Sequence, residues 1–307
     1  EYNVKTVPTG LRKVLHLNWA LVLLLTSVAA IGFLMLYSVA GGSMTPWAEP
    51  QMKRFALGMA AMFAIAMVPA YFWRNVAGLA YALSIALLLF VEFFGDIGMG
   101  AQRWIDLGFI RLQPSELTKI TLVMLLAAYY DWLDIRKVSR PFWVVVPVFL
   151  ILLPTFLVLK QPDLGTALLL VIGGGLVMFA AGVHWAYFAA VVASGGGLVY
   201  SVLASRGTSW QLLKDYQYRR IDTFLDPESD PLGAGYHITQ SKIALGSGGW
   251  GGRGFMQGTQ SRLNFLPEKH TDFIFTTLAE EFGFVGGVSL LGLYALIILF
   301  CVASAVK

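Results

Sequence analysis

The chain of 307 residues is 57% hydrophobic and only 13% charged, with a mean hydropathy of +0.68. An ordinary soluble domain has about 25% charged residues, so a water-soluble fold is excluded and the surrounding solvent must be lipid. The net charge of +4 is no argument for nucleic acid, because Lys and Arg set the orientation of a membrane protein.

Apolar runs follow one another along most of the chain. A span needs about 20 apolar residues, and we predict eight helices, over residues 18–40, 55–72, 76–94, 114–132, 142–159, 164–182, 184–204 and 272–305. Only Trp73, Arg74 and Asn75 separate the second run from the third. The last run is long enough to need a tilt or a break, for which Gly283 and the pair Gly286–Gly287 are candidates. The predicted fold is an all-α polytopic transmembrane bundle that forms one domain over residues 1–307.

The short loops predict the orientation of this bundle. With the N-terminus in the cytoplasm, Arg136, Lys137 and Arg140 fall on the cytoplasmic side, as the positive-inside rule requires. The long segment 205–271 then lies outside. On this topology Glu116, Asp163 and Asp272 all lie near the outer ends of helices.

The segment 205–271 contains recognisable elements. Its first part has residues recurring at three- and four-residue steps with charged residues between them, which is typical of an amphipathic helix on the membrane surface: Trp210, Leu213, Gln217, Ile221 and Phe224. Residues 236–245 are predicted as a second short helix, and 246–254 are too rich in glycine for regular structure. The pattern GxGxxG at 246–251 does not indicate a dinucleotide site, because it lies outside any βαβ unit. A mobile or re-entrant loop remains one reading, and a loop whose backbone amides approach a phosphate or pyrophosphate remains another.

Charged residues inside or beside apolar runs are the candidates for chemistry. Glu116 and Lys119 share one helical face, either as a structural ion pair or with Lys119 holding an anionic group in a cavity. Asp163 follows Gln161-Pro162 and could cap the next helix. Asp272 could also be a cap, but it ends five consecutive polar residues, 268–272, at a membrane boundary. A partly desolvated carboxylate there could act as a general base.

Five segments resemble the signature motifs of the SEDS family, the RodA/FtsW/SpoVE group, in the order that this family has them. They are AQRWIDLG (101–108), QPSELTK (113–119), KQPDLGTA (160–167), YHITQSKIALGSGG (236–249) and GTQSRLNFLPEKHTDFIFTTLAEEFGFVG (258–286). The form GTQS…FLPEKHTDF is more similar to the RodA branch than to the FtsW branch. The family has about ten helices, so we expect two C-terminal helices of the family to be missing from this chain.

The resemblance implies a peptidoglycan glycosyltransferase in the bacterial cytoplasmic membrane that polymerises lipid II on its outer face. It implies that Asp272 is the catalytic base. The residues that match substrate-binding motifs are Arg103, Ser115, Glu116, Lys119, Asp163, Gln260, Ser261, Glu268, Lys269, His270 and Thr271. Lys119, Arg103 or a divalent cation (Mg²⁺ or Mn²⁺) would offset the charge of the pyrophosphate.

The implied partners are membrane lipids, a class B penicillin-binding protein that cross-links the strands, and other membrane proteins of the elongation machinery, with no nucleic acid. Two other function classes stay open. A lipid flippase would also need a charged cavity in a helical bundle, although a transporter places its binding groups near the midplane. A scaffold without enzymatic activity would need only the spans and the surface helices.

Overall fold

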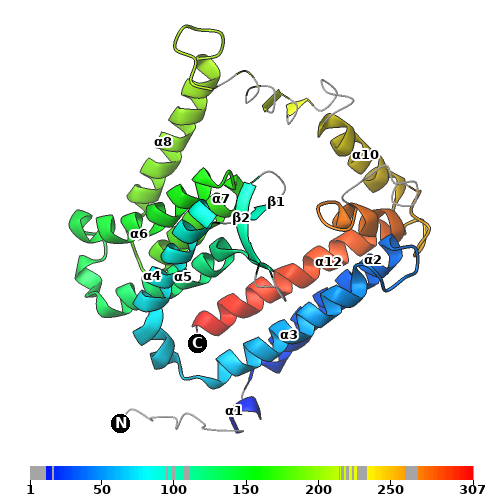
Figure 1. Ribbon diagram of the computed structural model, residues 1–307, viewed down its shortest axis with the longest axis horizontal. Helices are drawn as coiled ribbons and strands as arrows, with labels where there is room; N and C mark the ends of the chain where they lie inside the picture. The colour runs from blue at the N-terminus through cyan, green and yellow to red at the C-terminus, as the bar shows by residue number, and fades with distance from the viewer. Residues whose placement is uncertain are drawn as a thin grey trace. The chain divides into compact units, whose positions relative to one another are not determined.

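The computed structural model describes residues 12–15, 17–94, 96–98, 101–106, 111–213, 215, 218, 221–222, 225–226, 234–259 and 269–306. These residues form helices and one small sheet, in two compact units (Figure 1). The first unit consists of Glu1–Met67 and Gln211–Lys307, and the second of Val68–Trp210. Within the described residues, five helices are long and apolar enough to cross a membrane. The predicted all-α polytopic membrane fold is confirmed.

The first unit is built around its last helix. Its elements are α1 (Arg12–Leu15), α2 (Trp19–Val39), α3 (Ala48–Met67), α10 (Ala234–Ser247) and α12 (Ile274–Val306). The long helix α12 packs against α2 and α10, and α2 also packs against α3 (Figure 1). The helix predicted over 236–245 is confirmed as part of α10. Part of the amphipathic helix predicted around 210–224 lies outside the described residues, namely 214, 216–217, 219–220 and 223–224.

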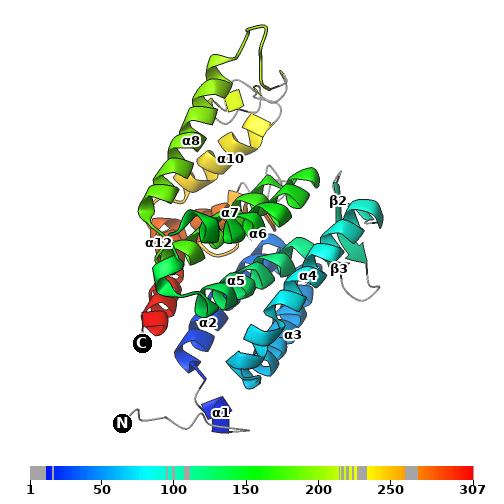
Figure 2. The same cartoon turned by 90° about the vertical axis from the view of Figure 1, so that its left-hand side faces the viewer.

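The second unit is a helical bundle with its own core. Its helices are α4 (Ala70–Phe94), α5 (Pro114–Trp132), the 3₁₀ turn η1 (Ile135–Lys137), α6 (Pro141–Lys160), α7 (Leu164–Ala180) and α8 (Trp185–Ala204). Helices α4 and α5 lie side by side, as do α6 and α7, and α5 also packs on α7 (Figures 1 and 2). Buried apolar side chains meet between them: Leu88, Leu122, Leu126, Ile151 and Leu170. Many other large apolar side chains remain on the outer surface, as lipid-facing side chains do.

The eight predicted apolar runs correspond in order to α2, α3, α4, α5, α6, α7, α8 and α12, but the predicted boundary between the second and third runs is wrong. The interruption between the two helices lies at Val68–Pro69, and residues 73–75 lie within the first turns of α4. Proline has no backbone N–H and disfavours the α conformation in the residue before it, so Pro69 ends α3. Helix α3 also begins earlier than predicted, at Ala48. In its first turns the side chain of Lys53 forms an ion pair at 2.6 Å with that of Glu49, four residues earlier.

The predicted loop 95–113 contains a small antiparallel sheet instead. Strands β1 (Asp96–Gly98), β2 (Ala101–Asp106) and β3 (Arg111–Leu112) pair in the order β1-β2-β3. Asp106 lies opposite Arg111 in the register, and their side chains form an ion pair at 3.5 Å. Strand β2 also contacts α4 and α5, so the sheet lies against the end of the bundle where α5 begins.

Helix α12 is interrupted at Gly283, whose φ of 67° and ψ of −164° are not helical. One of the positions predicted for a break is therefore confirmed. A break leaves backbone groups without helical partners, and the glycine loop (Gly248–Gly254) supplies them. The backbone bonds run from Arg253 N to Glu280 O (3.0 Å), Gly254 N to Glu281 O (3.0 Å), Phe284 N to Gly249 O (2.8 Å) and Val285 N to Trp250 O (3.2 Å).

The glycines of this loop are required by close backbone contact. A Cβ placed on Gly252 would lie 2.1 Å from the carbonyl oxygen of Glu281, and one on Gly248 would lie 2.1 Å from that of Ala279. Amides that a phosphate could have used, those of Arg253 and Gly254, already bond to α12. The loop therefore pairs with the backbone of α12. The reading in which amides of the GxGxxG pattern approach a phosphate stays a prediction.

Candidate active site

Asp272 lies in a turn just before α12 with its side chain exposed. Residues 269–273 form turns, and the helix begins at Ile274. The backbone N–H of Ile274 donates a hydrogen bond to the carbonyl oxygen of Thr271 at 3.3 Å. Within the described residues the Asp272 carboxylate makes no hydrogen bond, so it does not act as a helix cap there. The carboxylate is free to meet a ligand.

The residues before Asp272 are held more firmly. The ring of His270 stacks on that of Trp47, with centroids 4.5 Å apart and planes 15° from parallel. Trp47 lies in the turn between α2 and α3, so this stack ties the approach to α12 to a distant part of the same unit. Lys269 is partly buried, and burial lowers the pKa of its ammonium group. Thr271 is exposed beside Asp272.

Two buried glutamates on α12 were missed by the sequence reasoning. Glu280 is completely buried and accepts hydrogen bonds from the backbone N of Thr259 at 2.7 Å and from its hydroxyl at 3.0 Å. Glu281 is 2% exposed and accepts a hydrogen bond from Ser38 of α2. Two adjacent acidic residues inside an apolar run were the available signal, because charges in a span are costly and usually have a role.

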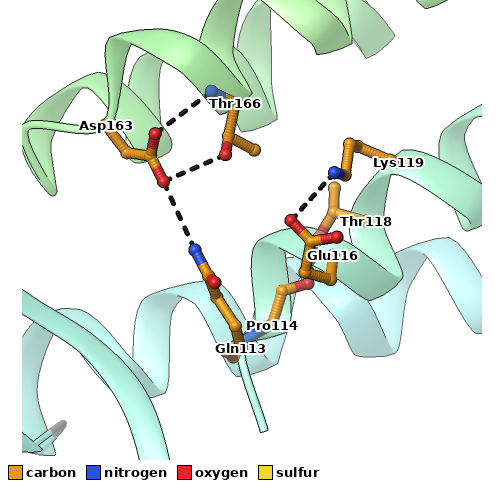
Figure 3. A network of polar contacts seen from close by, with 7 residues as sticks. All are labelled: Gln113, Pro114, Glu116, Thr118, Lys119, Asp163 and Thr166. Atoms are coloured by element: carbon orange, nitrogen blue, oxygen red, sulfur yellow. Dashed lines mark hydrogen bonds and ion pairs between the residues drawn. The ribbon is translucent and has the colours of Figure 1, made fainter. Parts of the chain in front are cut away.

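The second unit contains the expected pair of Glu116 and Lys119, near the start of α5 (Figure 3). Lys119 Nζ lies 2.8 Å from Glu116 Oε1, and their side chains are 28% and 55% exposed. The two residues face one way because they are three apart on a helix. The ion pair exists, and its partial exposure leaves both groups within reach of a further ligand.

Asp163 caps α7, as one reading of the sequence predicted. Its carboxylate accepts from the backbone N of Thr166 at 3.1 Å and from the Thr166 hydroxyl at 3.0 Å (Figure 3). It also accepts from the side-chain amide of Gln113 at 3.3 Å, which joins the start of α7 to the residue before α5. Ser115 is only 1% exposed, and its hydroxyl has no partner within the described residues.

The remaining predicted residues lie wholly or partly outside the described part of the chain. Arg103 lies in β2, and its side chain is outside the described set. Gln260, Ser261 and Glu268 also lie outside the described residues. The structure therefore brings Glu116, Lys119 and Asp163 to one end of the second unit, and places Lys269, His270, Thr271 and Asp272 together in the first. Among the described residues no group of three or more His, Cys, Asp or Glu side chains could hold a metal ion. The carboxylates described so far do not by themselves form a cation site.

Comparison with known proteins identifies relatives over nearly the whole chain. The family model described as "Cell cycle protein", for FtsW, RodA and SpoVE, matches residues 16–307. "Peptidoglycan glycosyltransferase MrdB" of Escherichia coli (strain K12) is 42% identical over 287 residues, covering 92% of this chain and 74% of that protein. "Probable peptidoglycan glycosyltransferase FtsW" of Thiomicrospira cyclica is 36% identical over 302 residues, covering 94% of this chain and 74% of that protein.

Solved structures agree with this result. One is described as "Structural coordination of polymerization and crosslinking by a peptidoglycan synthase complex" and is similar with a TM-score of 0.73 and 31% identity, covering 92% of this chain and 76% of that chain. The rod shape determining protein RodA of Thermus thermophilus is similar with a TM-score of 0.62 and 27% identity, covering 92% of this chain and 73% of that chain. The family match and the 42% identity to MrdB together show that the chain belongs to the SEDS family, the RodA/FtsW/SpoVE group of polytopic membrane proteins.

Proposed function

We propose that this chain is a peptidoglycan glycosyltransferase that polymerises lipid II at the outer face of the bacterial cytoplasmic membrane during cell elongation. The names of its relatives, peptidoglycan glycosyltransferase MrdB and FtsW, support this class of reaction. The single observation that carries the assignment of roles is the exposed carboxylate of Asp272, which makes no hydrogen bond within the described residues. A carboxylate that caps no helix remains available for proton transfer.

In the proposed reaction Asp272 takes the proton from the 4-hydroxyl of the acceptor GlcNAc. That oxygen bonds to the anomeric carbon of the donor, the bond from this carbon to the pyrophosphate oxygen breaks, and the configuration inverts. Undecaprenyl pyrophosphate leaves with the electron pair of the broken bond. The activated donor supplies the free energy, so the reaction requires no nucleotide. General-base catalysis of this kind contributes about 10²–10⁴-fold in rate.

Binding of the pyrophosphate is assigned to Lys119. Its ammonium group is partly exposed and paired with one carboxylate, Glu116, which leaves donors for a phosphate oxygen. Arg103 and a divalent cation (Mg²⁺ or Mn²⁺) remain proposed contributors to the same charge. The sugars are proposed to bind to the polar residues that precede Asp272 in the chain: Gln260, Ser261, Glu268, Lys269, His270 and Thr271. Ser115, which is buried, and Asp163, which caps α7, are proposed to bind the substrate in the second unit.

The proposed orientation places segment 205–271 and Asp272 outside the cytoplasm, with a class B penicillin-binding protein as the partner that cross-links the product. A cysteine at the exposed Ser209, in a Cys301→Ala background, tests the orientation. It should react with an impermeant reagent applied from outside. Labelling that appears only after the membrane is opened would reverse the assignment.

The activity is tested with purified protein and lipid II. Wild type should form glycan strands, and Asp272→Asn should lose about 10²–10⁴-fold in rate with its thermal stability unchanged. Asp272→Glu should fall between them, because a misplacement near 1 Å can cost about 10²-fold. A flippase would move lipid II across a vesicle bilayer without forming strands, and a scaffold would do neither. Strand formation by Asp272→Asn at the wild-type rate would move the base to another residue.

A further inference from the structure

A cavity opens between α4 and α5 of the second unit, at the end opposite the Glu116–Lys119 pair. Its volume is about 480 Å³. Its apolar side is lined by Ala70, Met124, Ala127 and Ala128. The small side chains of the three alanines leave room between two helices that otherwise pack closely. An acyl chain fits such a groove, because lipid surrounds the bundle at this level.

The polar side of the cavity contains one positively and one negatively charged side chain. Arg74 and Asp131 line it and form an ion pair, with guanidinium Nη1 2.8 Å from the carboxylate Oδ2. Both side chains are more than half exposed, at 56% and 58%. Within the described residues neither makes another hydrogen bond, so the second carboxylate oxygen and the remaining guanidinium N–H groups are free.

A buried donor adds to this arrangement. The indole Nε1 of Trp73 is buried and has no hydrogen-bond partner within the described residues, and Trp73 also lines the cavity. An unsatisfied buried donor costs about 1–3 kcal/mol, so a group that accepts its hydrogen bond stabilises the site. Helix α4 begins at Ala70, so its positive end lies at the same place. Trp73, Arg74 and the helix end together favour an anionic group.

The surrounding aromatic residues locate the cavity at the level of lipid headgroups. Trp132 and Trp143 lie with ring centroids 6.0 Å apart at the end of α5 and the start of α6. The ammonium of Lys137 lies 5.4 Å from the centroid of the Trp143 ring. Tyr71, in the first turn of α4, is 65% exposed. Trp and Tyr gather at membrane–water interfaces, with Lys and Arg beside them on the cytoplasmic side.

We propose that this cavity binds phosphatidylethanolamine, a phospholipid whose headgroup carries both a phosphate and a primary ammonium. The phosphate accepts hydrogen bonds from Arg74 and Trp73 Nε1 near the start of α4, and the ammonium donates to Asp131. One acyl chain lies in the groove lined by the alanines and Met124. A purely anionic headgroup would be repelled by Asp131, and a quaternary ammonium such as choline has no N–H to donate to it.

The test is native mass spectrometry of the 307-residue chain, delipidated in detergent and titrated with phosphatidylethanolamine, phosphatidylcholine and phosphatidylglycerol. Wild type should bind the ethanolamine lipid about tenfold more tightly than either of the others, since hydrogen bonds between charged groups are the strong ones. Asp131→Asn should remove the preference over phosphatidylcholine. Arg74→Gln and Trp73→Phe should weaken all three lipids.

A matched control is Arg140→Gln, a basic residue at the same end of the unit that does not line the cavity. This variant should bind the three lipids as wild type does. The proposal is overturned if wild type binds the three lipids equally, a result that needs no variant to fold. It is also overturned if Asp131→Asn keeps the preference for ethanolamine, or if Arg140→Gln loses it.

Discussion

The buried carboxylate of Glu280 accepts two hydrogen bonds from Thr259, one from the backbone N at 2.7 Å and one from the hydroxyl at 3.0 Å. This contact joins a residue 13 positions before Asp272 to a residue 8 positions after it. The contact fixes Thr259 against α12. Glu280 has no place in the proposed proton transfer, and we assign it the positioning of the segment that leads to Asp272.

Glu280→Ala should therefore loosen this segment. We expect a loss of about 1.5–3 kcal/mol, typical of a hydrogen bond to a charged group, and faster tryptic cleavage between Thr259 and Asp272. Glu280→Gln keeps an acceptor oxygen and should lie between Ala and wild type in both measurements. Thr259→Ser keeps both donors and serves as the control. Wild-type cleavage rates in Glu280→Ala would show that the contact does not hold the segment.

Gly283→Ala should be severely destabilising. Gly283 has a φ of 67°, and a Cβ added there would lie 2.3 Å from the backbone N of Gly252. The strained conformation alone costs about 1–3 kcal/mol, and the collision adds to this because backbone atoms cannot move aside. Gly292→Ala, in the same helix with nothing within 4 Å of its Cβ, is the control and should be neutral or stabilising. Thermal unfolding in detergent gives both values. Equal melting temperatures for the two variants would contradict the role of the break.

Removing both members of the Glu116–Lys119 pair separates structure from binding. An exposed ion pair contributes about 0–1 kcal/mol, and these side chains are 55% and 28% exposed. The double variant Glu116→Gln, Lys119→Met should therefore unfold close to the wild-type temperature. It should still lose polymerisation of lipid II, because the pyrophosphate loses its cation. Normal activity in a folded double variant would remove Lys119 from the site.

Asp163 offers a similar separation. Asp163→Ala loses the cap of α7 and should destabilise the protein by about 0.5–2 kcal/mol. Asn caps a helix as well as Asp does, so Asp163→Asn should melt near the wild-type temperature. If Asp163 acts only through the cap, the Asn variant should also polymerise lipid II normally. An Asn variant that is stable but inactive would show that the negative charge itself is needed by the substrate.

Hydropathy predicts the helices of this protein well, because a span in lipid must satisfy its backbone internally and be apolar along its length. The same signal misplaces the boundary near Pro69, since Trp73 and Arg74 are polar enough to resemble a loop yet belong to α4. The sheet over Asp96–Leu112 was not predicted, because its strands are too short for an alternating pattern. Local sequence predicts the cap at Asp163, which depends on neighbours three residues away.

Long-range contacts are what the sequence could not provide. The stack of His270 on Trp47 and the bonds between the glycine loop and α12 join residues far apart in the chain. Neither contact leaves a periodic pattern in the sequence. The backbone pairing depends on no particular side chain, because it needs only glycines whose missing Cβ leaves room for it. The candidate site residues that lie in the family motifs could be named from the sequence. Glu280 and Glu281 were recognised as important for the structure only from their burial.

The break in α12 also has a consequence for the order in which the protein is assembled. The ribosome makes the glycine loop before it makes α12, so the partner for the interrupted turn already exists when that helix enters the bilayer. In a circular permutant that begins at Ile274, α12 would be inserted first, with the carbonyls of Glu280 and Glu281 facing hydrocarbon unpaired. Such a permutant should be degraded during insertion, although its finished form would contain the same contacts.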